Sequence, residues 1–212
     1  MKKILVLCCC WLLTSCFEIT EKIKHHDNQS GDYTLIVDFS KSWFKTKSAM
    51  WLEEVDGVKI PNEEEITQKL LDFKRTASKI EGIANLSTKT DFDHYIFTIQ
   101  FTYQNLKALN AVVNVINKQK NQVHFNSNGK TFERIASYPV PEKLVKDPKK
   151  KTDLEQANII AVYTFDKNIA GATNSNSKIA KNKKTIFLKQ SMYNVLKKSS
   201  LMNNTIQLNP YI

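Results

Sequence analysis

The sequence predicts an α+β fold: a mostly antiparallel sheet with two helices packed on one face, followed by a C-terminal β-rich segment. Several segments alternate apolar and polar residues with the two-residue period of half-buried strands. Two other segments carry a single apolar stripe at helical spacing, which indicates that each helix buries one face. Turn sequences containing Asn and Gly separate neighbouring strands, as in antiparallel hairpins.

The first 15 residues are interpreted as a lipoprotein signal peptide. Two lysines precede an apolar run over 4–13, which is too short to span a bilayer as a helix. The following residues, Leu13-Thr14-Ser15-Cys16, resemble the bacterial lipobox, which is cleaved before a lipid-modified cysteine. We therefore expect export, lipidation at Cys16 and an outer-membrane location facing the periplasm. The alternative is an ordinary signal peptide that ends at a chance cysteine.

The mature chain is expected to contain a sheet-and-helix domain over 16–141, a lysine-rich linker over 142–153, and a basic β-rich segment over 154–212 packed on the same domain. All four cysteines lie within the first 16 residues, so the mature chain would keep only Cys16. No disulfide framework or cysteine metal site is then expected. The lipid would be the membrane anchor.

The excess positive charge is C-terminal. Residues 17–141 carry 16 basic and 16 acidic residues, whereas residues 142–212 carry 13 and 5. Only two of the 31 basic residues are arginine, the side chain best suited to phosphate recognition, so nucleic acid is not an expected partner. Six lysines are either solvated or form a contact surface for anionic headgroups or an envelope polyanion. They are Lys149, Lys150, Lys151, Lys181, Lys183 and Lys184.

The N-terminal half of the domain begins with a predicted hairpin. Alternation predicts strands over 17–25 and 33–39, joined by a polar turn. A short helical segment after Ser40 then carries four large apolar residues: Trp43, Phe44, Met50 and Trp51. Such a cluster either covers one end of the sheet, lines a pocket or enters a membrane interface.

The clearest helix signal begins at Asn62. Asn62 and Glu65 form a capping-box pattern, and an apolar stripe continues to Ile80 before Gly82. The three glutamates at 63–65 favour the positive end of the helix dipole, which explains them without a metal ion. A second helix is expected from Asn105 to about Asn117.

Further strands are expected over 83–90, 94–103, 123–125, 131–135, 159–165, 185–188 and 205–208, with a polar loop over 168–184. The strand over 94–103 carries an aromatic face that either thickens the core or, with the first helix, forms the floor of an apolar pocket for a lipid. The candidate pocket residues are Tyr95, Phe97, Ile99, Phe101 and Tyr103 on the strand, and Leu70 and Phe73 on the helix.

The sequence contains no pattern typical of catalysis. Four histidines lack metal-ligand spacing, so neither a metal nor a cofactor is expected. No nucleophile motif and no glycine-rich phosphate loop occur, so an enzyme is not expected. A carboxylate pair assembled from distant residues would still allow the alternative, an envelope hydrolase acting on glycan or lipid.

The order of elements adds a resemblance. A cysteine followed by a hairpin that reads Glu18-Ile19-Thr20 and then Ser30-Gly31-Asp32-Tyr33, with helices and strands after it, resembles envelope lipoproteins that contain an LppM-type domain. The resemblance implies an α/β sheet-and-helix fold and lipid or glycolipid binding. The sequence therefore favours a lipid-anchored, non-enzymatic binding or assembly module, whose partners are the membrane and a lipid or envelope protein.

Overall fold

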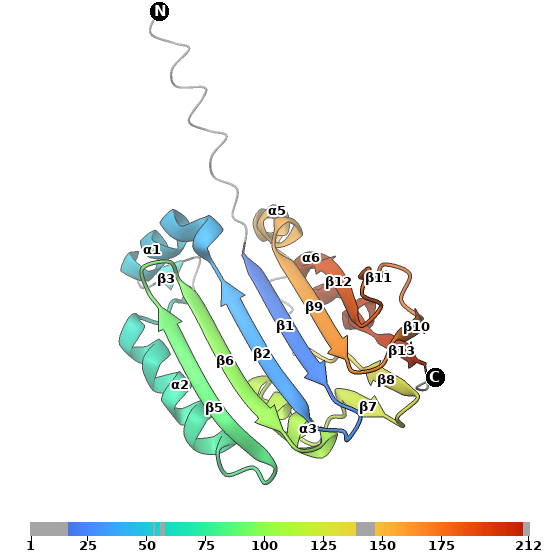
Figure 1. The fold of residues 1–212 in the computed structure, drawn as a ribbon. Helices are drawn as coiled ribbons and strands as arrows, with labels where there is room; N and C mark the ends of the chain where they lie inside the picture. Colours follow the sequence, from blue (N-terminus) through green and yellow to red (C-terminus); the bar gives the residue numbers. More distant parts are fainter. Residues whose placement is uncertain (1–16, 53, 56–57, 139–146, 210–212) are drawn as a thin grey trace, which may run out of the picture.

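A computed structural model describes residues 17–52, 54–55, 58–138 and 147–209 (Figure 1). The larger sheet has seven strands, in the order β11 (Lys178–Ile179), β12 (Thr185–Ser191), β9 (Asn158–Phe165), β1 (Glu18–His25), β2 (Gly31–Asp38), β6 (Ile96–Tyr103) and β5 (Ile83–Asp91). The smaller sheet has the order β10 (Ile169–Ala172), β13 (Asn204–Leu208), β8 (Thr131–Arg134) and β7 (Phe125–Ser127). A short ribbon pairs β3 (Glu54–Val55) with β4 (Val58–Lys59).

Most strand pairs are antiparallel. Among the described strands, β1 and β9 run parallel, and every other neighbouring pair is antiparallel. The helices are α1 (Trp43–Leu52), α2 (Glu63–Ala77), α3 (Leu106–Ile116), α5 (Pro148–Gln156) and α6 (Met192–Lys197), with 3-10 turns η2 (Ser40–Ser42) and η3 (Ser199–Met202). The α+β class with a mostly antiparallel sheet is confirmed.

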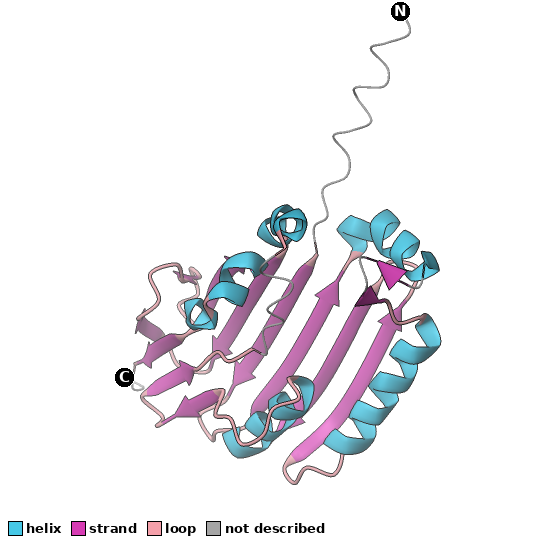
Figure 2. Cartoon of the chain, turned by 180° about the vertical axis from the view of Figure 1, so that it is seen from behind, coloured by secondary structure: helices cyan, strands magenta, loops and turns pink. Residues whose placement is uncertain are grey.

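The larger sheet buries one face. Along β1, Glu21, Ile23 and His25 are buried, while Lys22 and Lys24 between them are exposed. The helices α2 and α3 and the smaller sheet lie against the buried face (Figure 2), and no described element covers the opposite face (Figure 1). The expected packing of two helices on one face is confirmed.

Asparagine caps begin both of the predicted helices. The side-chain oxygen of Asn62 accepts from the Glu65 backbone N at 2.8 Å, and the Glu65 carboxylate accepts from the Asn62 backbone N at 3.3 Å. Asn105 accepts from the Ala108 backbone N at 2.9 Å in the same way. These side chains satisfy amide groups that have no partner within a helix, so local sequence determines where α2 and α3 begin.

The C-terminal segment completes the larger sheet. β9 pairs with β1 from Glu18↔Asn158 to His25↔Phe165, and β12 pairs with the other edge of β9. The predicted polar loop over 168–184 contains β10 and β11, because β13 and β12 supply partners that the sequence pattern did not reveal.

The second half of the linker predicted over 142–153 is helical. Residues 142–146 lie outside the described residues, but α5 begins at Pro148. Leu154 and Ala157 are buried, and Lys151 lies 3.7 Å from Glu155 one helical turn later. Glu155 therefore reduces the repulsion between the lysines of α5. The buried Leu154 and Ala157 give this segment a surface that packs on the domain.

Candidate membrane-facing site

Several elements meet at one end of the larger sheet. β1 begins at this end, and its antiparallel neighbour β2 ends there. β9 is parallel to β1, so it also begins there, and β12 ends there. The helices that follow β2, precede β9 and follow β12, namely α1, α5 and α6, consequently gather at this end (Figure 1). We call it the Phe17 end, after the residue that precedes β1.

Phe17 is fixed in the fold. Its backbone oxygen accepts a hydrogen bond from the Asn158 backbone N at 3.0 Å, and its ring stacks on Phe39 with the ring centroids 5.1 Å apart. Phe39 in turn leads directly into η2 and α1. The residue that follows Cys16 in the chain is therefore held by both the sheet and the connection to α1.

The helix α1 contributes no buried residue to the core. Phe44, Trp51 and Leu52 are 68%, 85% and 60% exposed, and we call these three side chains the α1 surface. The helix is attached through polar contacts: Trp43 Nε1 donates to the Asp93 backbone oxygen at 2.7 Å, and Lys45 Nζ lies 3.2 Å from the Asp153 carboxylate on α5. A ten-residue helix is marginal in isolation, so α1 depends on these attachments to the rest of the fold.

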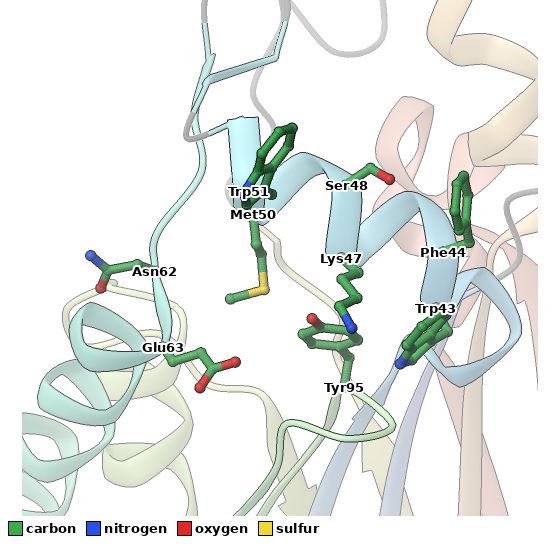
Figure 3. Close-up of a pocket in the computed structure, with 9 residues that line it drawn as sticks. All are labelled: Trp43, Phe44, Lys47, Ser48, Met50, Trp51, Asn62, Glu63 and Tyr95. Atoms are coloured by element: carbon green, nitrogen blue, oxygen red, sulfur yellow. The ribbon is translucent and has the colours of Figure 1, made fainter.

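A pocket of about 550 Å³ lies between α1, the start of α2 and the turn before β6. We call it the α1 pocket (Figure 3). Met50 extends into the space, and Lys47 Nζ lies over the Trp43 ring, 4.7 Å from its centroid. Its lining residues are Trp43, Phe44, Lys47, Ser48, Met50, Trp51, Asn62, Glu63 and Tyr95. Aromatic and thioether groups with one cation and one carboxylate at the rim suit an apolar chain that bears a polar group.

Charges at the Phe17 end are partly paired. Glu18 accepts from Lys41 Nζ at 3.0 Å, and Lys189 Nζ lies 3.8 Å from the other oxygen of Glu18. The stretch 39–52 contains Lys41, Lys45 and Lys47 but no acidic residue. The helix that presents the α1 surface therefore has a net positive charge.

The pocket predicted on the strand over 94–103 does not form there. Phe101 and Tyr103 are each 2% exposed and belong to the core. Phe101 stacks on Tyr33 with centroids 4.9 Å apart, and the Tyr103 hydroxyl lies 2.9 Å from Nδ1 of His25. Both rings belong to the hydrophobic core and fill the space that a pocket would need.

The other predicted pocket residues are dispersed. Phe97 and Ile99 are half-buried on β6, and Leu70 and Phe73 are half-buried on α2. Tyr95 lies in the turn before β6 with φ +55°, and it alone of the predicted set lines the α1 pocket. The sequence pattern placed Tyr95 on the strand, and the left-handed turn moves it to the sheet end.

The six predicted contact lysines do not form one surface. Lys150 and Lys151 lie on α5, before β9, whereas Lys183 and Lys184 lie beside the other end of β9, where the Lys184 backbone oxygen accepts from the Phe165 backbone N at 2.9 Å. Eight strand residues span about 26 Å, so the two groups face opposite ends of the sheet. Lys181 belongs with the distant group, and the side chain of Lys149 lies outside the described set.

A buried ion pair joins the two sheets, and the sequence interpretation missed it. Arg134 on β8 donates from Nε to Glu21 at 3.1 Å and from Nη2 to the other Glu21 oxygen at 3.2 Å. The Tyr163 hydroxyl donates to Glu21 at 2.6 Å, and Arg134 Nη2 donates to the Tyr138 hydroxyl at 3.1 Å. Burial, with Glu21 nearby, raises the pKa of Tyr163 well above its usual value, so the hydroxyl keeps its proton.

The buried cluster around Glu21 and Arg134 is suited to a structural role, holding the two sheets together. Burial alone would lower the pKa of Arg134, but Glu21 raises it well above the usual value, so the guanidinium stays charged. His124, also buried, has a pKa lowered to about 4 by burial and by Arg134. The ion pair and the side chains around it lie between the two sheets, and none of these residues lines the α1 pocket.

No group of three potential metal-ligating side chains occurs within the described ranges. His26 instead lies 3.0 Å from Asp166, and His94 lies 2.9 Å from Asp91. No helix in the part of the chain that the structure describes is long and apolar enough to cross a membrane.

Comparisons with known proteins give one structural similarity. The chain is similar to the folded domain of the LppM protein from Mycobacterium tuberculosis, solved by NMR, with a TM-score of 0.48 and 11% identity over 95% of this chain and 94% of that one. No protein-family model matches the chain. No curated protein matches it either.

Proposed function

We propose that this chain is a lipid-anchored protein of a bacterial envelope, attached through Cys16 and acting as a non-enzymatic binding module. The observation that carries the proposal is the position of Phe17. The Phe17 backbone oxygen accepts a hydrogen bond from the Asn158 backbone N, and the Phe17 ring stacks on Phe39. Phe17 is also the residue directly after the lipobox cysteine. The anchor and the folded domain are therefore adjacent in the chain.

Adjacency to the anchor would keep one end of the domain near the bilayer. Neighbouring Cα atoms are about 3.8 Å apart, so lipid on Cys16 would hold the Phe17 end at the bilayer. Several acyl chains attach a protein durably, whereas one chain binds reversibly. We place the protein at the outer membrane, facing the periplasm.

The α1 pocket is the proposed ligand site, and a lipid is the proposed ligand. The pocket combines aromatic walls with Met50, and Lys47 and Glu63 supply opposite charges at its rim. Its location at the Phe17 end would bring it close to lipid molecules of the same bilayer.

The buried carboxylate of Glu21 is engaged by Arg134 and Tyr163, which supports a structural role for this acid.

Attachment through Cys16 is tested by metabolic labelling with an alkyne-bearing palmitate analogue. The natural chain and the Cys10→Ala variant should be labelled and recovered with membranes, because the lipobox is intact in both. The Cys16→Ala variant should lose both the label and the membrane attachment. Equal labelling and equal membrane recovery of Cys16→Ala would contradict the proposal.

Lipid binding is tested separately by native mass spectrometry of a Cys16→Ser protein released from mild detergent. A co-purified lipid is expected, and Met50→Lys, which puts a charge in the α1 pocket, should abolish it. Leu71→Lys is the matched control, because Leu71 is 53% exposed on α2 and lies outside the pocket. An unliganded Cys16→Ser protein, or equal lipid loss in both lysine variants, would contradict a lipid site here.

A further inference from the structure

We propose that α1 is a second membrane contact, which lies in the headgroup region of a bilayer containing anionic lipid. The inference rests on the proposed lipid anchor, because the anchor places the Phe17 end at the membrane. It adds a partner for a surface that the fold leaves uncovered. The occupant is the bilayer surface itself, met by the α1 surface and the lysines beside it.

Burial supplies the first argument. Phe44, Trp51 and Leu52 are each at least 60% exposed, and none of the ten residues of α1 is buried. The aromatic side chains among them are suited to the boundary between headgroups and acyl chains, where an apolar ring is covered and polar groups remain hydrated. Transfer of these side chains from water would stabilise the helix as well as the contact.

Charge supplies the second argument. Lys45 and Lys47 lie on α1, which has no acidic residue, and Lys41 lies on η2 before it, whereas Glu53 and Glu54 follow the helix directly. Their partners, Glu18 for Lys41 and Asp153 for Lys45, belong to the neighbouring elements β1 and α5. Each lysine near an anionic leaflet contributes about 1 kcal/mol, and the combination of basic and aromatic residues is typical of interfacial helices.

Placement supplies the third argument. The Phe17–Phe39 stack connects the residue after Cys16 to the start of η2 and α1. The close-up shows Trp51 at the edge of the α1 pocket, directed away from Tyr95 and Glu63 (Figure 3). A lipid on Cys16 and the side chains of the α1 surface would therefore reach the same bilayer from the same end of the sheet.

The tryptophans allow a site-specific test. The sequence has three, Trp11, Trp43 and Trp51, so a chain that starts at residue 16 keeps only the two on α1. All described elements begin after residue 16, so this chain retains the whole described fold. With Cys16→Ser it carries no lipid. Its tryptophan emission would be recorded with vesicles of phosphatidylcholine alone and with added phosphatidylglycerol, each with or without acyl chains brominated near their middle.

With phosphatidylglycerol present, the emission should shift to shorter wavelength and be quenched by the brominated lipid. Phe44→Ser with Leu52→Ser should weaken vesicle binding at least about tenfold, through loss of buried apolar surface. Phe187→Ser is the matched control: Phe187 is 42% exposed on β12, outside α1, and its loss should leave binding unchanged.

The charge requirement has its own pair of variants. Lys45→Gln with Lys47→Gln should weaken binding about 30-fold, the factor for about 1 kcal/mol from each of two lysines. Lys183→Gln with Lys184→Gln, at the opposite end of the sheet, should have no effect. Circular dichroism would verify that every variant keeps the natural fold.

Tryptophan emission unchanged by anionic vesicles would overturn the inference and would indicate a protein partner for α1. Equal vesicle binding by the natural protein and the α1-surface variants would also overturn it. So would a larger loss of vesicle binding in Phe187→Ser than in Phe44→Ser with Leu52→Ser. None of them bears on the anchor, because the vesicle assay uses the unlipidated protein. Failure of the anchor would instead appear as palmitate labelling that does not depend on Cys16.

Discussion

Replacing Arg134 by methionine tests how the two sheets are held together. Arg134 is 2% exposed, and its guanidinium contacts both carboxylate oxygens of Glu21, at 3.1 and 3.2 Å. Methionine keeps much of the buried volume but leaves the Glu21 carboxylate without its countercharge. Removing one partner of a buried pair costs about 3–5 kcal/mol, so the free energy of unfolding should fall by that amount.

The double variant Glu21→Leu with Arg134→Met separates charge from packing. It removes both charges, so it should be more stable than either single variant. The hydroxyls of Tyr163 and Tyr33 would lose their acceptor, at 2.6 and 3.4 Å, and each buried, unpaired donor costs about 1–3 kcal/mol. Urea unfolding followed by far-UV circular dichroism gives each free energy by linear extrapolation. A loss below about 1 kcal/mol in Arg134→Met, or additive losses in the double variant, would show that the buried ion pair does not hold the two sheets together.

Three further predictions concern the rest of the fold. Gly31→Ala should lower the thermal midpoint strongly, because a Cβ there would lie 2.2 Å from the Lys24 backbone oxygen; a midpoint within error of the natural protein would contradict this. Asn62→Ala should cost about 1 kcal/mol in urea unfolding through loss of the α2 cap, and an unchanged unfolding free energy would count against the capping box. Burial, and then the neighbouring His26, lowers the pKa of His25 to about 4, below its usual 6.5, so the stability from neutral His25 is complete above about pH 6.5 and is lost as the pH falls towards 4. Urea titrations at pH 7 and pH 5 should differ by about 2 kcal/mol more in the natural protein than in His25→Leu, and equal differences would disprove this source of pH dependence.

Local patterns were sufficient to predict many elements. The alternation over 17–25 and 33–39 indicated β1 and β2, and the asparagine caps marked the starts of α2 and α3. These signals arise from neighbours in sequence, through the two-residue strand period and the unpaired amides of a first helical turn. They required no knowledge of distant partners.

Pairing between distant segments was not readable in the same way. The parallel contact of β1 with β9 joins residues about 140 positions apart, and no local pattern specifies it. The pair of Glu21 and Arg134 gave a weak signal, since Glu21 lies between Ile19 and Ile23 on the inward face of β1. A polar residue at an inward position needs a partner, but its identity depends on tertiary packing.

The candidate site was predictable only in part. The aromatic residues of 43–51 were recognised as a cluster, but their irregular spacing did not distinguish core from surface. The aromatic face of β6 gave the stronger pattern, yet Phe101 and Tyr103 are core residues, because β6 packs against α3 and these rings meet Tyr33 and His25. The position of Tyr95 depends on a left-handed backbone conformation in its turn, which alternation alone does not reveal.

We propose that lipid on Cys16, directly beside the folded domain, attaches the chain to a membrane. Intact-mass spectrometry of the protein purified from membranes tests it most directly. We expect a chain that begins at Cys16 and is heavier than its amino-acid sequence by a diacylglyceryl group, with or without a further acyl chain. A membrane-derived protein with an unmodified Cys16, or a mature chain that begins at another residue, would contradict it.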